Sequence, residues 1–135
     1  TVILALWCGE EQGLYGSTHY VEREPIVPLD STRLMIQLDY LDDQNGPCIT
    51  NVTEDEMIQR FIGAAARENR VIVMDTKGQC ASDDCPFLEH KVPACRFIAQ
   101  GEHHHHDIDT LANLSRTMLR ETADLVIEGI RNTAY

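Results

Sequence analysis

Two adjacent acidic residues, Glu10 and Glu11, follow closely after an apolar run at residues 2–7. Such a run is typical of a fully buried strand in an α/β sheet, and these sheets bind ligands beyond the carboxyl ends of their strands. Neighbouring side chains of extended backbone point in different directions, so one carboxylate can bind a metal ion while the other faces a metal-bound water. The pair therefore indicates metal-assisted hydrolysis. The alternative is a solvated acidic turn, which is the commoner fate of an isolated glutamate pair.

Other polar residues also follow predicted strands. Asp39 comes directly after the apolar stretch 34–38, and four consecutive histidines occupy residues 103–106, between a predicted strand and the last predicted helix. An expression tag is normally terminal, whereas this histidine run is internal. Histidine and carboxylate side chains are the usual nitrogen and oxygen ligands of zinc. Cys8 lies too deep in its strand to be a ligand and is interpreted as a small core residue.

The elements that must position these residues alternate as in an α/β protein. A turn is expected at residues 42–47, a capping box at residues 53–56, and a polar loop at residues 78–85. The final helix is expected to direct Leu111, Leu114, Met118, Leu125 and Ile130 toward the core. We expect strands at residues 2–7, 34–38, 71–74 and 94–98, helices at residues 13–22 and 53–68, a helical turn near residues 87–88, and a final helix capped by Asp107 or Asp109.

The composition describes one acidic domain. The 135 residues carry a formal net charge of −11, are 43% hydrophobic, and include Lys77 and Lys91 as their only lysines. Such a chain has no basic patch to neutralise phosphates, which argues against nucleic-acid binding. The length fits one domain, residues 1–135, and no apolar run reaches the length of a membrane span. The chain opens in its first apolar run, without an initiator methionine or signal peptide, and so looks processed.

The cysteines and two glycosylation patterns bear on location. Five cysteines are an odd number, so at least one has no disulfide partner within the chain. Cys80 and Cys85 could close a small loop, or all five could be reduced thiols of a cytosolic protein. Acceptor patterns at Asn51 and Asn113 favour a secreted or extracytoplasmic location slightly over a cytoplasmic one.

Four stretches in register resemble the co-catalytic dizinc aminopeptidases, a family that includes bacterial leucyl aminopeptidases and glutamate carboxypeptidase-like metallopeptidases. The first is WCGEEQGLYGSTHY at residues 7–20, which contains the family's Glu-Glu-x-Gly-Leu-x-Gly-Ser setting. The others are IQLDY at 36–40, SDDCPF at 82–87 with VPA at 92–94, and HHDIDT at 105–110. One such stretch would be weak evidence, but four in the same order make a chance match unlikely.

The resemblance implies a zinc-exopeptidase-like three-layer sandwich, with a mixed, mainly parallel sheet flanked by helices. It identifies Glu10 as the general base and Glu11, Asp39 and His105 as metal ligands in a site for two Zn²⁺ ions. His105 has the family spacing to Asp109, but a second histidine follows it where relatives have a small Ser or Thr, which leaves His104 as the alternative. The resemblance also implies a peptide or amino-acid-derivative substrate.

Two features qualify this interpretation. Asp84 stands where relatives often have a histidine, so the loop around Asp83 and Asp84 is expected either to shape the substrate pocket or to be a plain solvent loop. The family's upstream histidine ligand and bridging aspartate do not occur before Thr1. We therefore expect a carboxyl-terminal part of one metallopeptidase catalytic domain, present as a partial domain and dependent on an upstream segment. Alone it should be inactive and bind at most one zinc ion.

Two other functions remain open, and oligomeric state is not predicted. One is a non-catalytic binding module with the peptidase fold, although intact Glu10, Glu11, Asp39 and His105 argue against it. The other is a glutaminyl cyclase-like zinc acyltransferase, which would use similar carboxylates to close an amino-terminal glutamine instead of cleaving a bond.

Overall fold

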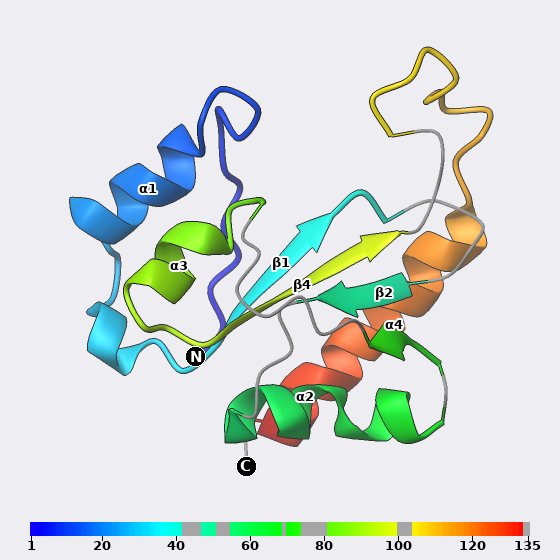
Figure 1. The fold of residues 1–135 in the computed structure, drawn as a ribbon. Coiled ribbons are helices and arrows are strands. Elements are labelled where there is room, and N and C mark those ends of the chain that lie inside the picture. Colours follow the sequence, from blue (N-terminus) through cyan, green and yellow to red (C-terminus); the bar gives the residue numbers. More distant parts are fainter. Residues whose placement is uncertain (42–46, 51–54, 69, 74–80, 100–103, 134–135) are drawn as a thin grey trace.

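The computed structural model describes residues 1–41, 47–50, 55–68, 70–73, 81–99 and 104–133. Its sheet has the strand order β1-β4-β2-β3, with β1 at Met35–Asp39, β2 at Pro47–Thr50, β3 at Ile72–Val73 and β4 at Ala94–Ala99 (Figure 1). β1 pairs with β4 and β2 pairs with β3 in parallel, while β2 and β4 are antiparallel. The predicted mixed, mainly parallel sheet is confirmed. β2 is an element that the sequence patterns did not predict.

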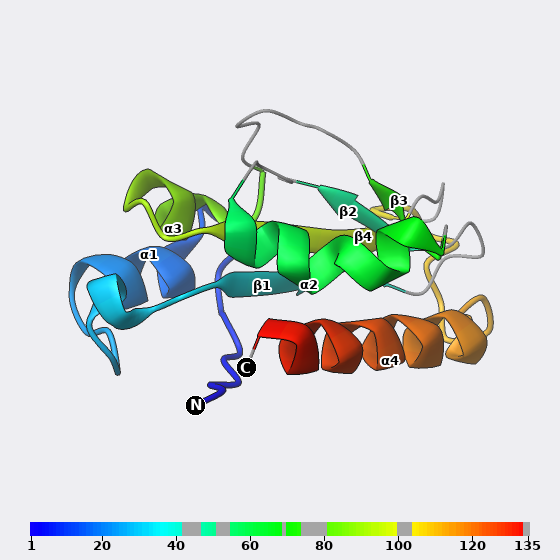
Figure 2. The same ribbon diagram turned by 90° about the horizontal axis from the view of Figure 1, so that it is seen from below.

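Helices flank both faces of this sheet. They are α1 (Tyr15–Glu22), α2 (Glu56–Arg67), α3 (Cys85–Glu89) and α4 (Arg116–Thr133), and a short 3₁₀ turn covers Leu29–Ser31. Successive side chains of a strand point to opposite faces. On β4, Cys95 and Phe97 therefore pack with apolar residues of α2 and α4, whereas Ala94 packs with residues of α1 and α3. Figures 1 and 2 show α1 with α3 on one side of the molecule and α2 with α4 on the other.

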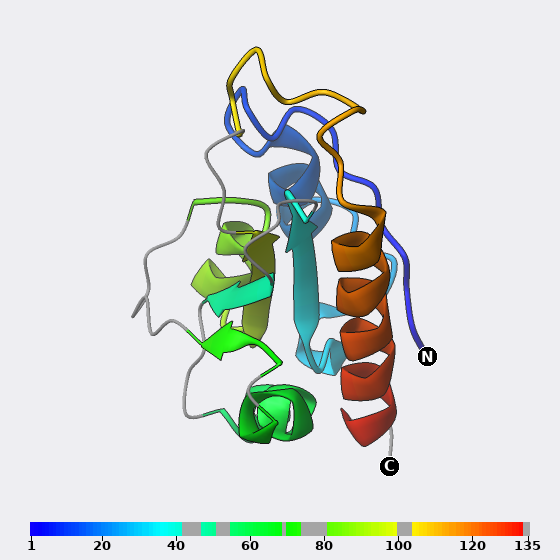
Figure 3. The same cartoon turned by 90° about the vertical axis from the view of Figure 1, so that its right-hand side faces the viewer.

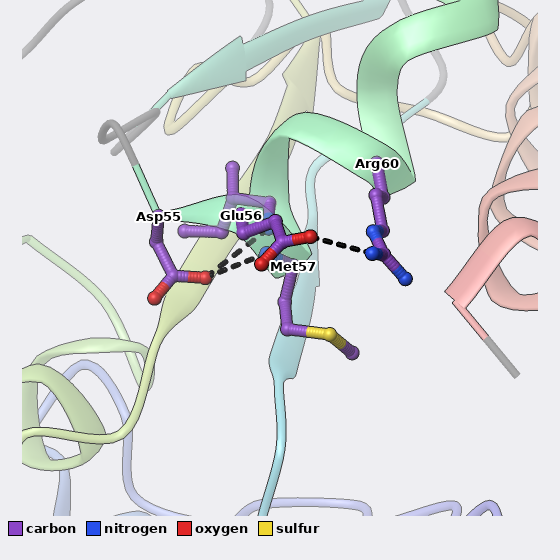
Figure 4. Close-up of polar contacts among 5 residues, drawn as sticks. Asp55, Glu56, Met57 and Arg60 are labelled. Atoms are coloured by element: carbon purple, nitrogen blue, oxygen red, sulfur yellow. Dashed lines mark hydrogen bonds and ion pairs between the residues drawn. The ribbon is translucent and has the colours of Figure 1, made fainter.

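Helix α2 begins with a side-chain cap and carries one apolar face. The Asp55 carboxylate accepts hydrogen bonds from the backbone N–H groups of Met57 and Ile58, at 2.9 and 3.4 Å (Figure 4). Glu56 and Arg60, one turn apart, form an ion pair. Asp55 is thus the cap among the described residues. Residues 53 and 54 of the predicted capping box at 53–56 lie outside the described residues. The face toward the core consists of Ile58, Phe61, Ile62 and Ala65.

The apolar run at residues 2–7 is not a strand, which corrects the prediction. Its backbone lies outside the sheet, and Val2, Leu4 and Leu6 are 69%, 87% and 92% exposed. An isolated extended segment gains neither ladder hydrogen bonds nor burial, and β1 pairs only with β4 in the described sheet. Only the end of the run is packed, because the Trp7 ring lies 5.3 Å from that of Tyr20 and 5.9 Å from that of Phe87.

The final helix begins later than predicted. α4 starts at Arg116, and the Ser115 hydroxyl accepts a hydrogen bond from the Met118 N–H at 3.3 Å, so Ser115 is its cap instead of Asp107 or Asp109. The Asp109 N–H instead closes a turn onto the His106 carbonyl at 2.9 Å. Leu111 precedes the helix and is 82% exposed, so it does not reach the core. Leu125 is buried, and Ile130 packs against the core as predicted.

Several predictions lie partly outside the described residues. The turn at 42–47 is described only at Pro47, where β2 begins. The third predicted strand, 71–74, is described at residues 71–73, of which Ile72–Val73 form β3. Because Cys80 and Asn51 are not described, neither the Cys80–Cys85 pairing nor the first glycosylation pattern is tested. None of the described helices is both long and apolar enough to cross a membrane.

Candidate active site

The loop with Glu10 and Glu11 is held against the start of α1 by backbone hydrogen bonds. The Glu10 carbonyl accepts from the N–H groups of Gly13 and Leu14, both at 3.0 Å, and the Cys8 carbonyl accepts from Gly16 at 2.9 Å. A Cβ at Gly16 would lie 2.8 Å from the Cys8 nitrogen, closer than real Cβ contacts come. Glycine is therefore required at this approach, and the backbone of the acidic pair is fixed relative to α1.

The Glu11 side chain contacts the loop before α4 that contains His104 and His105. Its Oε1 lies 2.7 Å from Nε2 of His105, although the two residues are far apart along the chain. Figure 3 shows the two loops side by side at one end of the molecule. His104 belongs to the same group, since one ligand atom from each of Glu11, His104 and His105 lies within 4.8 Å of the others. Carboxylate and imidazole form a donor set that fits Zn²⁺.

Glu10 is half-buried beside further acidic residues. Burial raises the pKa of the Glu10 carboxyl, and the negative charges of Asp39, Glu11 and Asp83 raise it further. A hydrogen bond from Ser82 acts in the opposite direction and lowers this pKa. Ser82 is itself fully buried and accepts a hydrogen bond from Gln37 Nε2 on β1 at 3.4 Å. Glu10 is therefore oriented by a short hydrogen-bond chain that starts on the sheet.

Asp83 is a buried carboxylate that the sequence did not identify as a candidate site residue. It is 3% exposed, and its Oδ1 accepts a hydrogen bond of 2.5 Å from the Ser17 hydroxyl on α1. Burial raises its pKa, and so does the charge of Asp39, while the Ser17 hydrogen bond lowers it. Glu10, Asp39 and Asp83 thus converge from two loops and the carboxyl end of β1. Their combined charge lowers the cost of holding a divalent cation nearby.

Asp84 anchors the same loop to the sheet. It is fully buried, and its Oδ1 lies 3.8 Å from Nη1 of Arg96 on β4. The Arg96 Nε donates to the Thr50 hydroxyl on β2 at 3.2 Å. Because Ser82, Asp83 and Asp84 are all buried, the expectation of a plain solvent loop is wrong for these residues. The Asp84–Arg96 ion pair and the Arg96–Thr50 hydrogen bond therefore connect the loop that contains Ser82 to β4 and β2.

The predicted site residues are thus partly assembled. Glu11 and His105 are in contact, and Asp39 is close enough to Glu10 for its charge to raise the Glu10 pKa. Asp39 is not part of the described group that contains Glu11 and the two histidines. This separation is compatible with Asp39 serving a different ion, as the family resemblance implies, and the individual roles stay predictions.

The sequence profile of Peptidase family M28 matches residues 1–130. The chain belongs to this family. The predicted kinship with the dizinc aminopeptidases is thereby confirmed, together with the fold class. Comparison with curated protein sequences gives no match.

Solved structures agree with this assignment. An aminopeptidase from Aneurinibacillus sp. strain AM-1 is 25% identical, with a TM-score of 0.76 over 94% of this chain and 32% of its own. A zinc aminopeptidase from Bacillus subtilis is 20% identical, with a TM-score of 0.77 over 92% of this chain and 33% of its own. A glutaminyl cyclase from an Acidobacteriales bacterium is 22% identical, with a TM-score of 0.65 over 87% of this chain and 45% of its own, which shows a shared fold. The chain spans about a third of the length of these aminopeptidases.

Proposed function

We propose that this chain contributes to a zinc-dependent exopeptidase of the aminopeptidase type. The observation that carries the proposal is the contact of Glu11 with His105 directly beside the half-buried carboxyl of Glu10. Membership of Peptidase family M28 and the similarity to zinc aminopeptidases support it. The substrate would be a peptide or amino-acid derivative with a free α-amino group.

In this proposal Glu11 and His105 hold one zinc ion and Asp39 helps to hold a second. Bound zinc would activate a water molecule and polarise the scissile carbonyl. Glu10 would take a proton from the attacking water and deliver it to the departing amine. A raised pKa suits this role, because the carboxylate is then a stronger base and its protonated form persists nearer to neutral pH. Ser82 would keep the Glu10 carboxylate in a fixed orientation.

We further propose that residues 1–135 form the carboxyl-terminal part of the catalytic domain. This is supported by the match to about a third of each aminopeptidase and by the exposed apolar side chains at residues 2–6. An upstream segment would supply the histidine and bridging aspartate and cover those side chains. The isolated chain should then bind at most one zinc ion and leave amino-acid p-nitroanilides uncleaved, and ordinary turnover by it would refute this part.

The Glu10→Gln variant of the full-length protein tests the proposed catalytic role. Glutamine keeps the shape and hydrogen-bonding capacity but cannot accept a proton, so kcat should fall on the order of 10²–10⁴-fold. Zinc content, measured by atomic emission, should remain that of the wild type. A matched loss of zinc would mean that Glu10 is a ligand and that the roles of Glu10 and Glu11 are exchanged.

Substrates decide between peptidase and cyclase chemistry. The same preparation should be offered leucine p-nitroanilide and a dipeptide that begins with glutamine. Release of p-nitroaniline without pyroglutamate formation is expected. Pyroglutamate as the only product would replace the exopeptidase proposal with the cyclase, and no turnover with intact zinc binding would favour a binding module.

A further inference from the structure

We propose that His104 is a ligand of the same metal ion as Glu11 and His105, so that these three side chains form a site for one divalent cation of the zinc class. The inference rests on the proposed metal site at Glu11 and His105. It adds a ligand from within the histidine run and makes a three-ligand site entirely from this chain.

The positions of the ligand atoms support one shared ion. The Glu11 carboxylate and the His105 Nε2 are already 2.7 Å apart, and a His104 nitrogen lies with both inside a 4.8 Å group. Zinc ligands stand about 2.0–2.2 Å from the ion, so small side-chain rotations can bring the three atoms to bonding distance. The rings of His104 and His105 are 4.0 Å apart and inclined by 56°. Two tilted imidazoles can therefore direct nitrogens toward one point.

The backbone explains how two consecutive histidines serve one site. Successive side chains of extended backbone point to opposite sides. His105 instead has a φ of 63°, in the left-handed region, within a turn of the loop. Residues other than glycine adopt this conformation uncommonly, and it recurs at ligand-binding sites. The turn keeps both rings on the side of Glu11.

A ring contact holds His104 near the end of the sheet. Its imidazole stacks on the Tyr40 ring, with centroids 4.7 Å apart and planes inclined by 26°. Tyr40 directly follows β1, and its carbonyl accepts a hydrogen bond from the Ala99 N–H at the end of β4. His104 is therefore positioned from the sheet, while His106, which is exposed like His104, lies outside the metal group.

The ligand set also has a defined chemistry. Two imidazoles and one carboxylate would occupy three positions of a tetrahedral ion and leave the fourth for the bridging aspartate that the proposed upstream segment would supply. Replacing a third ligand normally weakens binding and changes the geometry of the ion. Both properties can be measured without any turnover.

The experiment titrates the metal-free 135-residue chain with Zn²⁺ by calorimetry and with Co²⁺ by visible absorption. The variants are His104→Ala, His105→Ala and Glu11→Gln, with His106→Ala as the matched control and circular dichroism as the test of folding. One ion per chain is expected for the wild type and the control. The affinity of His104→Ala, His105→Ala and Glu11→Gln for the ion should fall about 100-fold or more. This loss is larger than the one expected when a residue that only hydrogen-bonds to a metal ligand is removed. His104→Cys, which restores a zinc ligand, should recover binding.

Each other result overturns the inference. If His104→Ala binds as the wild type while His105→Ala and Glu11→Gln do not, the proposed site stands without His104. Equal weakening by all three histidine variants, with Glu11→Gln unaffected, would mean that the histidine run chelates metal without Glu11. A chain that binds no ion also refutes the three-ligand site. The exopeptidase proposal is tested separately by turnover of the full-length Glu10→Gln variant.

Discussion

Replacing Gly129 by alanine should loosen the contact between α2 and α4. Gly129 is buried in α4 and faces Phe61 of α2, and a Cβ there would lie 2.4, 2.5 and 2.8 Å from three atoms of the Phe61 ring. The ring has little room to retreat, because Phe61 is 3% exposed and packs edge-on against Phe97 at 5.8 Å. The added methyl group must therefore displace the ring or the helix.

Two opposing effects set the magnitude. Alanine in a helix interior is more favourable than glycine by about 1 kcal/mol. Overpacking a well-filled core costs about 1–3 kcal/mol, and contacts this short place Gly129→Ala toward the upper part of that range. We expect a net loss of about 1–2 kcal/mol in the free energy of unfolding. Gly63→Ala in α2 is the matched control, because its nearest atom is the mobile Arg67 guanidinium at 3.6 Å, and it should gain about 0.5–1 kcal/mol.

Urea unfolding followed by circular dichroism measures both variants. Opposite signs for Gly129→Ala and Gly63→Ala are the expected result. A Phe61→Leu background should remove most of the penalty at Gly129, giving a positive coupling in the double-mutant cycle. Stabilisation by Gly129→Ala equal to that of Gly63→Ala would refute the close packing of α2 on α4 at Phe61.

Two further predictions concern the acidic site. Burial raises the pKa of the Asp83 carboxyl in the folded protein above its ordinary value of 3.8. The contribution of this carboxyl to the free energy of unfolding is therefore fully present at a pH below 3.8, and it is lost as the pH rises through the folded-state pKa. The asparagine of Asp83→Asn can still accept the hydrogen bond from the Ser17 hydroxyl. The urea concentration at the midpoint of its unfolding in metal-free buffer should therefore rise relative to that of the wild type as the pH increases from about 4. A difference between the two midpoints that does not change with pH would contradict the raised pKa. Gly16→Ala should push the Cys8 backbone away and displace Glu11, lowering zinc affinity in calorimetry by roughly tenfold or more. An unchanged affinity would show that this close approach does not set the position of Glu11.

Local sequence patterns were sufficient where short-range physics decides the outcome. The apolar stretches before Asp39 and around Cys95 became β1 and β4, and α1 and α2 fall within the predicted helices. Asp39 lies at the carboxyl end of β1, where the sequence placed it, and the four family stretches were enough to identify the family. The order of residues carries this information directly, because periodicity and motifs are local.

Long-range contacts decided the rest. Residues 2–7 have the composition of a buried strand, but a strand exists only with a neighbour to complete its hydrogen-bond ladder. The sequence offered Asp107 and Asp109 as caps of the final helix, but in the folded chain Ser115 caps it instead. Asp83 accepts a hydrogen bond from Ser17, 66 residues away, and Glu11 contacts His105, which lies far from it along the chain. The family resemblance placed Glu11 and His105 in one metal site, but periodicity alone gives neither contact, because both depend on which segments the sheet brings to the same edge.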